Sequence, residues 1–458
     1  MSPNTKQKGN TGQALLTALV ADQHGDIFEL GGYAAAGRAG SSLMVLDGAQ
    51  TISMPYGSEL MYLPDRQPIL FNIKKRKFET IEENPFKPGE PIFPVAVFNS
   101  PGYVISYTCA FKEKKTASHL PLFSYGAVGW EPGGFRSAAI MVDREKRQDL
   151  RRMKIEKVMD GIREMQRRMP DNRLRKHLEH CALDYGCPAA KNFFLGRYEA
   201  PLPTAGGCNA RCLGCLSRQE TAEVPVSQKR ITFTPLPEEI ADIALTHIHR
   251  VKRAIVSFGQ GCEGDPLMAA HVIEQAIRKI RSKTHKGTIH MNTNGSKPKM
   301  LMRLIEAGLD SVRISMNSVR KPYYDAYFRP VGYSFSDVQK SIELSLAHER
   351  FVSINYLNCP GFTDSPEEFD ALIGFLKQYP VHMIQWRNLN FDPLRYWQLM
   401  EKIGTCGPPV GMANLMEQIR SRFPQIRYGY FNPPKETFRP RQNRSPRVKQ
   451  HQKVGRHV

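Results

Sequence analysis

Three cysteines lie close together near the middle of the chain, at Cys208, Cys212 and Cys215, directly after two glycines. Three residues separate the first two cysteines and two residues separate the last two, so one short loop holds three thiols. Cysteine thiolates are the usual ligands of iron–sulfur clusters. A four-iron cluster takes four ligands, so three cysteines leave one iron open to a small molecule. The loop therefore predicts a [4Fe–4S] cluster that takes part in a reaction.

The alternative for the same three cysteines is a structural zinc site. Such sites usually have four protein ligands, often from two Cys-x2-Cys pairs, and the chain has no second tight cysteine cluster. We therefore favour the iron–sulfur cluster. Cys181 and Cys187 lie just upstream of the loop, and they are candidates for a second metal site that takes further ligands from elsewhere.

The composition is that of a folded protein without membrane spans. The chain has 458 residues, of which 41% are hydrophobic and 9% aromatic, enough for about two or three domains. No apolar run is long enough to span a membrane, and the first residues lack the apolar core of a signal peptide. We therefore expect a cytoplasmic protein, in which cysteines bind metals or react rather than form disulfides. The net charge of +20 fits an acidic partner, nucleic acid included, and it fits plain solubility equally well.

The region around the cysteine loop predicts alternating strands and helices. Strands are expected just before the cysteine loop and at 253–258, 288–291, 311–315, 352–357 and 381–386. Helices are expected at about 234–250, 267–283, 297–307, 334–349 and 366–378. Such alternation predicts an α/β fold with a parallel sheet and right-handed crossovers. Five or six units suit a partial, TIM-like (βα)6 barrel, because a complete eight-unit barrel typically needs about 250 residues.

The rest of the chain has a different character on each side of this barrel. The N-terminal part carries strand and turn signals, among them Asp47-Gly48 between two apolar runs, which predicts a hairpin. Residues 143–180 are strongly charged with apolar residues at helical spacing, which predicts one long helix. The predicted division is a β-rich accessory domain at 1–142, a helical linker at 143–190, the barrel at 191–395, a helical cap at 396–433 and a basic disordered tail at 434–458.

Polar and glycine-rich segments follow the expected barrel strands. In a parallel α/β sheet, ligands bind at the carboxyl ends of the strands. The second strand leads into the glycine-rich segment 258–266, where glycines let the backbone approach a ligand closely. Its carbonyl groups and acidic side chains suit an ammonium group, so we expect a ligand site at this edge of the sheet.

This combination of a cysteine loop and a barrel, over about residues 195–392, resembles the radical S-adenosylmethionine (SAM) superfamily. Within it, the chain looks most like the branch of the molybdenum-cofactor cyclase and the peptide-modifying enzymes. The resemblance implies a [4Fe–4S] cluster on Cys208, Cys212 and Cys215 and a SAM molecule on the open iron. It also implies reductive cleavage of SAM to a 5′-deoxyadenosyl radical that abstracts hydrogen from a substrate, while the protein supplies orientation.

The resemblance further implies residues that bind SAM. Gly264 and Asp265 match the end of the family's Gly-Gly-Glu-Pro element, which holds the methionine ammonium group, and Glu263 replaces its first glycine. Asn294 lies in a Thr-Asn-Gly element, and Ser315 falls where the family directs a serine toward the methionine carboxylate. The alternative for Asn294 and Ser315 is that they cap helices or end strands.

Further candidates follow the fifth and sixth strands. Asn355 and the later Gly361 match residues that lie near the adenosyl group in the family. Cys359 is a candidate donor of a hydrogen atom or a thiyl radical, and its alternative is a small buried hydrophobic residue. Arg387 and its neighbours follow the sixth strand and are candidates to face the substrate, because Arg can pair bidentately with a carboxylate or phosphate.

The chain departs from the family pattern in two ways. The residue before the third cysteine is commonly aromatic in the family, and here it is Gly214, so contacts to adenine must come from elsewhere. The region after residue 395 lacks the cysteine-rich extension of many peptide-modifying members, and Cys406 alone cannot bind an auxiliary cluster.

These observations predict a radical SAM enzyme with a protein or peptide substrate, because the N-terminal domain could dock a polypeptide. A reductant such as flavodoxin or ferredoxin is the expected partner. An RNA-modifying radical SAM enzyme is the alternative, and only the basic charge supports it. A hypothesis of another class is a non-catalytic nucleic-acid-binding protein stabilised by a metal.

Overall fold

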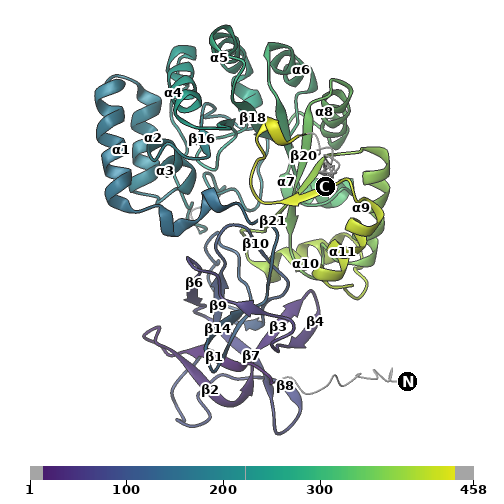
Figure 1. Ribbon diagram of the computed structural model, residues 1–458. Helices are drawn as coiled ribbons and strands as arrows, with labels where there is room; N and C mark the ends of the chain where they lie inside the picture. The colour runs from purple at the N-terminus through teal and green to yellow at the C-terminus, as the bar shows by residue number, and fades with distance from the viewer. Residues whose placement is uncertain (1–13, 222, 439–458) are drawn as a thin grey trace, which may run out of the picture.

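The computed structural model describes residues 14–221 and 223–438. Figure 1 shows an open, curled sheet with helices on its outer side, and a β-rich N-terminal region that packs below it. Among the described residues, no helix has both the length and the apolar character needed to cross a bilayer.

The N-terminal region consists of short strands that pair antiparallel with one another. The strands are β1 Thr17–Ala21, β2 Ile27–Ala34, β3 Ala36–Ala39, β4 Ser42–Val45, β5 Ile52–Ser53, β6 Glu59–Tyr62, β7 Arg66–Asn72, β8 Lys77–Thr80, β9 Phe93–Phe98, β10 Tyr103–Ile105, β11 Thr108–Cys109, β12 Phe111–Glu113, β13 Val128–Glu131, β14 Gly134–Ser137 and β15 Ala139–Met141. The β-rich character predicted for this region is confirmed.

The hairpin predicted at Asp47-Gly48 is wrong. β4 pairs with the preceding strand β3, and β5 pairs with β14, far along the chain. The Asp47 carboxylate accepts hydrogen bonds from the backbone N–H groups of Ala49, at 2.8 Å, and Gln50, at 3.1 Å. An Asp side chain that bonds the following backbone favours a local turn over a two-residue hairpin loop.

The single long helix predicted over 143–180 is also wrong, because this segment contains two short 3-10 helices and two separate α-helices. The elements here are η1 Lys146–Gln148, η2 Leu150–Arg152, α1 Ile155–Arg168, α2 Arg173–Leu183 and α3 Pro188–Phe194. Pro170 lies in the break between α1 and α2, where its missing N–H and its ring end the first helix. The Asn172 side chain then caps α2 by accepting a hydrogen bond from Arg175 N at 2.9 Å.

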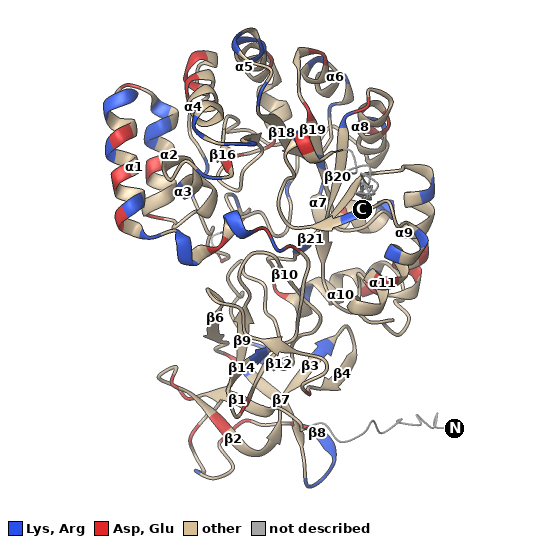
Figure 2. Cartoon of the chain, viewed as in Figure 1, with Lys and Arg blue, Asp and Glu red and all other residues tan. Residues whose placement is uncertain are grey.

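The outer face of α1 is charged without being uniformly basic. Figure 2 shows basic and acidic residues interspersed along this helix. Glu164 forms ion pairs with Arg168, at 3.2 Å on the same helix, and with Arg250, at 3.3 Å. Mixed charges of this kind are typical of a solvated helix face.

The C-terminal half forms the barrel. Its strands are β16 Glu199–Pro201, β17 Ile255–Phe258, β18 Thr288–Thr293, β19 Ser311–Met316, β20 Phe351–Asn358, β21 Met383–Asn388 and β22 Arg427–Gly429. Its helices are α4 Pro237–Arg250, η3 Pro266–Ala269, α5 Ala270–Lys283, α6 Pro298–Ala307, α7 Lys321–Phe328, α8 Phe335–Ala347, α9 Pro366–Gln378, α10 Pro393–Ile403, α11 Met412–Arg422 and η4 Lys435–Thr437. The strands lie in sequence order and every neighbouring pair is parallel. The predicted fold class, a partial TIM-like barrel with a β-rich N-terminal region, is confirmed.

Two elements extend the barrel beyond the prediction. The segment 396–433, predicted as purely helical, also contains β22, which pairs with β21. Residues 434–438 were expected to be disordered, yet Lys435 lies in the helix η4 and donates its backbone N–H to Thr288 Oγ1 at 2.7 Å. The remainder of the predicted tail lies outside the described residues. The helix α7 was not predicted, and the domain boundaries given above stay predictions.

One hydrophobic core runs through the barrel and the linker helices. It joins Val158 and Ile162 of α1 to Phe193 of α3 and to the apolar faces of the barrel helices. The linker therefore packs on the barrel as part of the same core.

The N-terminal region contacts the carboxyl ends of the barrel strands through asparagine side chains. Asn388 Oδ1 accepts a hydrogen bond from Ile105 N at 2.9 Å, and Asn388 Nδ2 donates to Tyr103 O at 3.0 Å. Asn358 Nδ2 donates to Ile105 O at 2.6 Å. These bonds fasten β10 to β20 and β21, so the N-terminal region covers the end of the barrel where ligands are expected.

A buried ion-pair network forms a second contact between the two halves. Arg66 of β7 is 1% exposed and pairs with Glu113 at 2.8 Å and with Asp392, just before α10, at 3.3 Å. Arg395 of α10 also pairs with Glu113, at 2.9 Å. The positive charges of two arginines thus offset the negative charges of two carboxylates at the contact between the two halves.

We predict that Arg66→Met destabilises the protein by about 3–5 kcal/mol, because it leaves two carboxylates, of which Asp392 is buried, with Arg395 as their remaining cation. Urea unfolding followed by intrinsic fluorescence measures the change. The exposed Arg76→Met is the control and should unfold like the wild type. Equal midpoints for both variants would contradict a stabilising role for the network.

Candidate functional site

A cavity of about 460 Å³ opens at the carboxyl ends of the barrel strands. Its walls include residues from the ends of β18, β19, β20 and β21 and from the segments that follow β17 and β22. Phe98, Asn99, Pro101 and Ser124 of the N-terminal region also line it. The size lies within the range of small-molecule and cofactor sites, and both halves of the protein build it.

The three loop cysteines, Cys208, Cys212 and Cys215, all line this cavity and are half-buried. The end of α7 holds their loop in place. Arg211 N donates to Phe328 O at 2.9 Å, and Leu213 N donates to Tyr327 O at 3.1 Å. The loop therefore has a fixed backbone, although it contains no regular helix or strand.

The distances between the loop sulfurs bear on the choice between an iron–sulfur cluster and a structural zinc ion. A metal ion needs several donor atoms close to one another. Among the described residues, His177, Cys181 and Cys262 form the one group of three or more His, Cys, Asp or Glu residues whose donor atoms all lie within 4.8 Å of one another. Cys208, Cys212 and Cys215 do not form such a group, so their three sulfurs do not all lie within 4.8 Å of one another. A mononuclear zinc site requires donors close around one ion, whereas a cubane binds each cysteine on a different iron. The donor set fits the cluster better than a single ion.

Burial governs the acidity of the Cys208 and Cys212 thiols. It raises the pKa of Cys208 to about 11, helped by the negative charge of Asp265, and it raises the pKa of Cys212 strongly. Thiolates are the form that binds metal. A cation in the loop would stabilise them, so metal binding would release protons.

The loop after β17 is fixed by Glu263. Its buried carboxylate accepts hydrogen bonds from the backbone N–H groups of Gly259 and Gln260, both at 2.7 Å, and of Thr204 and Ala205, at 2.8 and 3.0 Å. Burial raises the pKa of Glu263 to about 7, while these four hydrogen bonds act in the opposite direction. Glu263 thus ties its own loop to the chain that leads into the cysteines.

Gly264 and Asp265 continue this attachment through their backbones. Gly264 N donates to Ala205 O at 2.6 Å, and Asp265 N donates to Gly207 O at 3.0 Å. A Cβ atom on Gly264 would lie 1.8 Å from Gly207 O, so only glycine fits there. The two loops are in direct backbone contact next to Cys208.

The Asp265 side chain is buried and already hydrogen-bonded in the structure. Its carboxylate accepts from Thr293 Oγ1 at 2.8 Å, from Asn294 N at 2.6 Å and from Leu267 N at 3.0 Å. It lines the cavity, but its bonds connect the loop to the end of β18. The structure therefore gives Asp265 a positioning role, and its contact with an ammonium group stays a prediction.

Asn294 has a similar place in the site. It lines the cavity, donates from Nδ2 to Asn209 Oδ1 at 2.9 Å, and accepts from Ser296 N at 2.9 Å. Asn209 belongs to the cysteine loop. Asn294 thus joins β18 to that loop, and its polar atoms are engaged with protein.

Ser315 and Asn355 lie side by side in the cavity wall. Asn355 Nδ2 donates to Ser315 Oγ at 3.4 Å, while Asn355 Oδ1 is buried without a hydrogen-bond partner among the described residues. Because a buried polar atom normally has a partner, this amide is available to a ligand. The structure brings both predicted residues to the same spot.

Cys359 does not line the cavity, although it follows β20 as expected. It is 3% exposed, its backbone N–H bonds to Thr363 Oγ1 at 2.9 Å, and burial raises the pKa of its thiol. Its side chain packs into the hydrophobic core, as the alternative of a small buried residue implies. A role of Cys359 in hydrogen transfer stays a prediction.

The space beside Gly214 contains an aromatic ring from another element. A Cβ atom on Gly214 would lie 2.8 Å from the hydroxyl oxygen of Tyr327 and 2.8 Å from Asn390 O. Tyr327 lines the cavity and was missed by the sequence analysis, because α7 itself was missed.

Three arginines line the cavity, and only Arg387 was expected there. Arg230 donates from Nη2 to Cys215 Sγ at 3.4 Å and from Nε to Ser217 Oγ at 3.1 Å. Arg313 is buried and bonds to Gln385 Oε1, and burial together with the charge of Arg387 lowers its pKa to about 9. The sequence analysis missed Arg230 and Arg313, because no sequence motif distinguishes either residue from a surface arginine.

Residues 202–376 match a protein-family model. The match covers the cysteine loop, the 258–266 loop and the strands β17–β20. That model is described as the Radical SAM superfamily. The chain contains a radical SAM domain. The two cofactors of this superfamily, a [4Fe–4S] cluster and SAM, are therefore the cofactors of the domain. A comparison with curated proteins finds no significant match.

Solved structures similar to the chain include several radical SAM proteins. One is anSMEcpe with bound AdoMet, with 17% identity and a TM-score of 0.33 over 42% of this chain and 51% of that one, so the chain matches about half of that protein's length. Another is HydG, a maturase of the [FeFe]-hydrogenase, with 13% identity and a TM-score of 0.35 over 61% and 64% of the two chains. A third is SuiB from Streptococcus suis bound to S-adenosylmethionine, with 12% identity and a TM-score of 0.34 over 49% and 48%. The assignment of the radical SAM domain rests on the family match rather than on these similarities.

We predict that Gly264→Ala weakens SAM binding by roughly tenfold or more, because the added methyl group collides with Gly207 O and separates the two loops. Equilibrium dialysis with labelled SAM on anaerobically reconstituted protein measures the effect. Gly207→Ala is the matched control, because a Cβ atom there lies no closer than 3.9 Å to another group. Equal dissociation constants for the two variants would contradict the role given to this contact.

Proposed function

We propose that the protein is a radical SAM enzyme whose reaction takes place in the cavity at the carboxyl ends of the barrel strands. When bound, the reduced cluster and SAM supply a 5′-deoxyadenosyl radical that abstracts a hydrogen atom from the substrate. The observation that carries the proposal is that Cys208, Cys212 and Cys215 share one cavity with Ser315 and Asn355. The three sulfurs do not all lie within 4.8 Å of one another, which supports a cluster over a single ion.

The residues of the cavity have separate proposed tasks. The three cysteines bind the cluster, and Arg230, which donates to Cys215 Sγ, stabilises its negative charge. The backbone of the loop around Gly264 receives the ammonium group of SAM. Ser315 and Asn355, with the unpartnered Oδ1 atom, bind the remaining polar groups. Asp265 and Asn294 hold the loop after β17 and the cysteine loop in place at the end of β18.

The N-terminal region closes the site. Phe98 and Pro101 add apolar surface to a cavity whose other walls carry both polar and apolar side chains. Such a cover limits the access of water, which protects a reactive species from side reactions. The N-terminal region is therefore proposed to take part in substrate binding as well.

Two arginines favour a substrate with an anionic group. Arg313 and Arg387 both line the cavity, and the Nε atom of each is buried without a hydrogen-bond partner among the described residues. Burial, and after it the charge of Arg387, lowers the pKa of Arg313 to about 9. A carboxylate or phosphate would offset both charges and pair with the guanidinium groups.

We favour a protein or peptide as the substrate, with one of its carboxylates at the two arginines. RNA is the alternative, in which a phosphate would take this place. A one-electron reductant such as flavodoxin or ferredoxin is the proposed partner, and the net charge of +20 favours an acidic protein in that role. The proposed compartment is the cytoplasm.

The first test is anaerobic reconstitution of the cluster followed by reduction in the presence of SAM. We expect about four irons per chain and formation of 5′-deoxyadenosine by the wild type. The variant with Cys208, Cys212 and Cys215 all changed to Ala should form none. Bound zinc in place of iron, or a cluster that never cleaves SAM, would contradict the proposal and favour a metal-stabilised nucleic-acid-binding protein.

The second test compares substrate classes by their stimulation of 5′-deoxyadenosine formation. Because the arginines favour a carboxylate, we expect stimulation by a mixed peptide library and less stimulation by the same library with its carboxyl groups amidated. Arg387→Met should lose the difference between the two libraries while it keeps its iron content. Stimulation by total RNA and by neither library would instead support RNA modification.

A further inference from the structure

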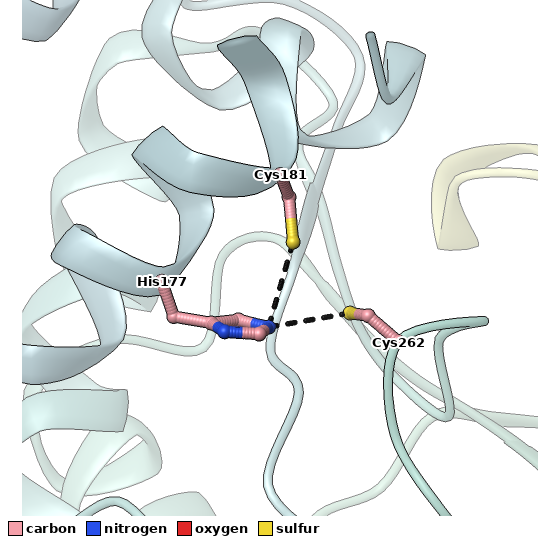
Figure 3. Close-up of side chains that lie close together, drawn as sticks. All are labelled: His177, Cys181 and Cys262. Carbon is pink, nitrogen blue, oxygen red and sulfur yellow. Dashed lines mark hydrogen bonds between the residues drawn. The ribbon is translucent and has the colours of Figure 1, made fainter. Parts of the chain in front are cut away.

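A second group of metal-binding side chains lies next to the cavity and plays no part in the proposed reaction. His177 and Cys181 lie one helical turn apart on α2, and Cys262 comes from the loop after β17. His177 Nε2 is 3.5 Å from Cys181 Sγ and 3.4 Å from Cys262 Sγ. Figure 3 shows the imidazole ring directed toward both sulfur atoms.

The distances match those around a tetrahedral zinc ion. Zinc–sulfur bonds of about 2.3 Å and zinc–nitrogen bonds of about 2.0–2.1 Å place the sulfur and nitrogen ligands about 3.6 Å apart at the tetrahedral angle. Both observed nitrogen–sulfur distances lie close to this value. All three donor atoms lie within 4.8 Å of one another, so one ion can contact all of them.

Charge and burial also suit a divalent cation. Cys181 and Cys262 are 1% and 5% exposed, while His177 is partly exposed. Two thiolates and a neutral imidazole around a divalent ion have no net charge, which lowers the cost of burial. The partly exposed histidine leaves one side of the group accessible, so that an ion and a fourth, non-protein ligand can enter.

We propose that His177, Cys181 and Cys262 bind a single zinc ion. Zinc combines readily with thiolate and imidazole ligands, and sites with three protein donors and one open position are known for Cys2His sets. The other pairing considered from the sequence, Cys181 with Cys187, is not supported, because Cys187 is not part of the group.

The zinc ion would join two parts of the protein that are separated in sequence. His177 and Cys181 belong to the linker helices, and Cys262 directly precedes Glu263, which holds the loop against the cysteine segment. The ion would thus restrain the loop from its outer side. Because metal binding stabilises the state that contains the formed site, its loss should lower the thermal stability of the protein.

Zinc content and cobalt spectra test the site independently of the proposed function. The protein used is the full chain with Cys208, Cys212 and Cys215 changed to Ala, which excludes metal bound in that loop. We expect about one zinc per chain by elemental analysis. Replacement by Co²⁺ should give the d–d bands of tetrahedral coordination and a thiolate charge-transfer band.

Variants in α2 identify the ligands without changing the loop of Cys262. In the same background, Cys181→Ala and His177→Ala should each weaken zinc binding by roughly tenfold or more and lose the thiolate or tetrahedral cobalt signature. Cys109→Ala, which removes a buried cysteine of the N-terminal region, is the matched control and should keep both.

Three outcomes would overturn the proposal. One is the same zinc content in Cys181→Ala, His177→Ala and the control. Another is the absence of stoichiometric zinc and of a cobalt spectrum in folded protein. The third is a Cys181–Cys262 disulfide in protein purified under reducing conditions, detected by mass spectrometry, because two thiols joined in this way cannot bind zinc.

Discussion

The contact between residues 204–207 and 263–265 is the constraint on which the rest of the site depends. One buried carboxylate, that of Glu263, accepts hydrogen bonds from the backbone N–H groups of Thr204 and Ala205 in the first segment and of Gly259 and Gln260 in its own loop. Backbone bonds from Gly264 and Asp265 complete the contact. Because the first segment leads directly into Cys208, this contact fixes the cysteine loop relative to the strands. A side chain in place of the hydrogen of Gly264 would leave no room for it.

Both halves of the protein build the cavity. The barrel supplies the cysteine loop and the polar strand ends, but the side opposite them is open in a half-barrel. The N-terminal region fills this side with Phe98 and Pro101, and asparagines at the ends of β20 and β21 bind the backbone of β10. The strand ends therefore have two tasks, since some of their side chains face the cavity and others fasten its cover.

Much of the barrel could be predicted from the sequence, because its signals are local. The helix expected at 366–378 is α9, Pro366–Gln378, since Ser365 caps it and Pro366 suits its first turn. The errors occur where distant contacts decide the structure. β22 has three residues and exists because β21 offers it a partner. The turn at Asp47 does not join a hairpin, because β5 pairs with β14 rather than with β4.

The sequence by itself determined the ligand types and the order of the site: three cysteines in one loop, a glycine-rich turn after the next strand and polar residues after those that follow. These features are local, because spacing within a loop and the end of a strand are properties of a few adjacent residues. Only the tertiary structure decided which distant side chains meet. His177 reaches Cys262 across 85 positions, Arg313 and Arg387 line the same cavity, and Cys359 packs into the core. Such contacts depend on how helices pack on the sheet, and hydrophobic periodicity specifies the buried face of an element but not the residue that it will contact.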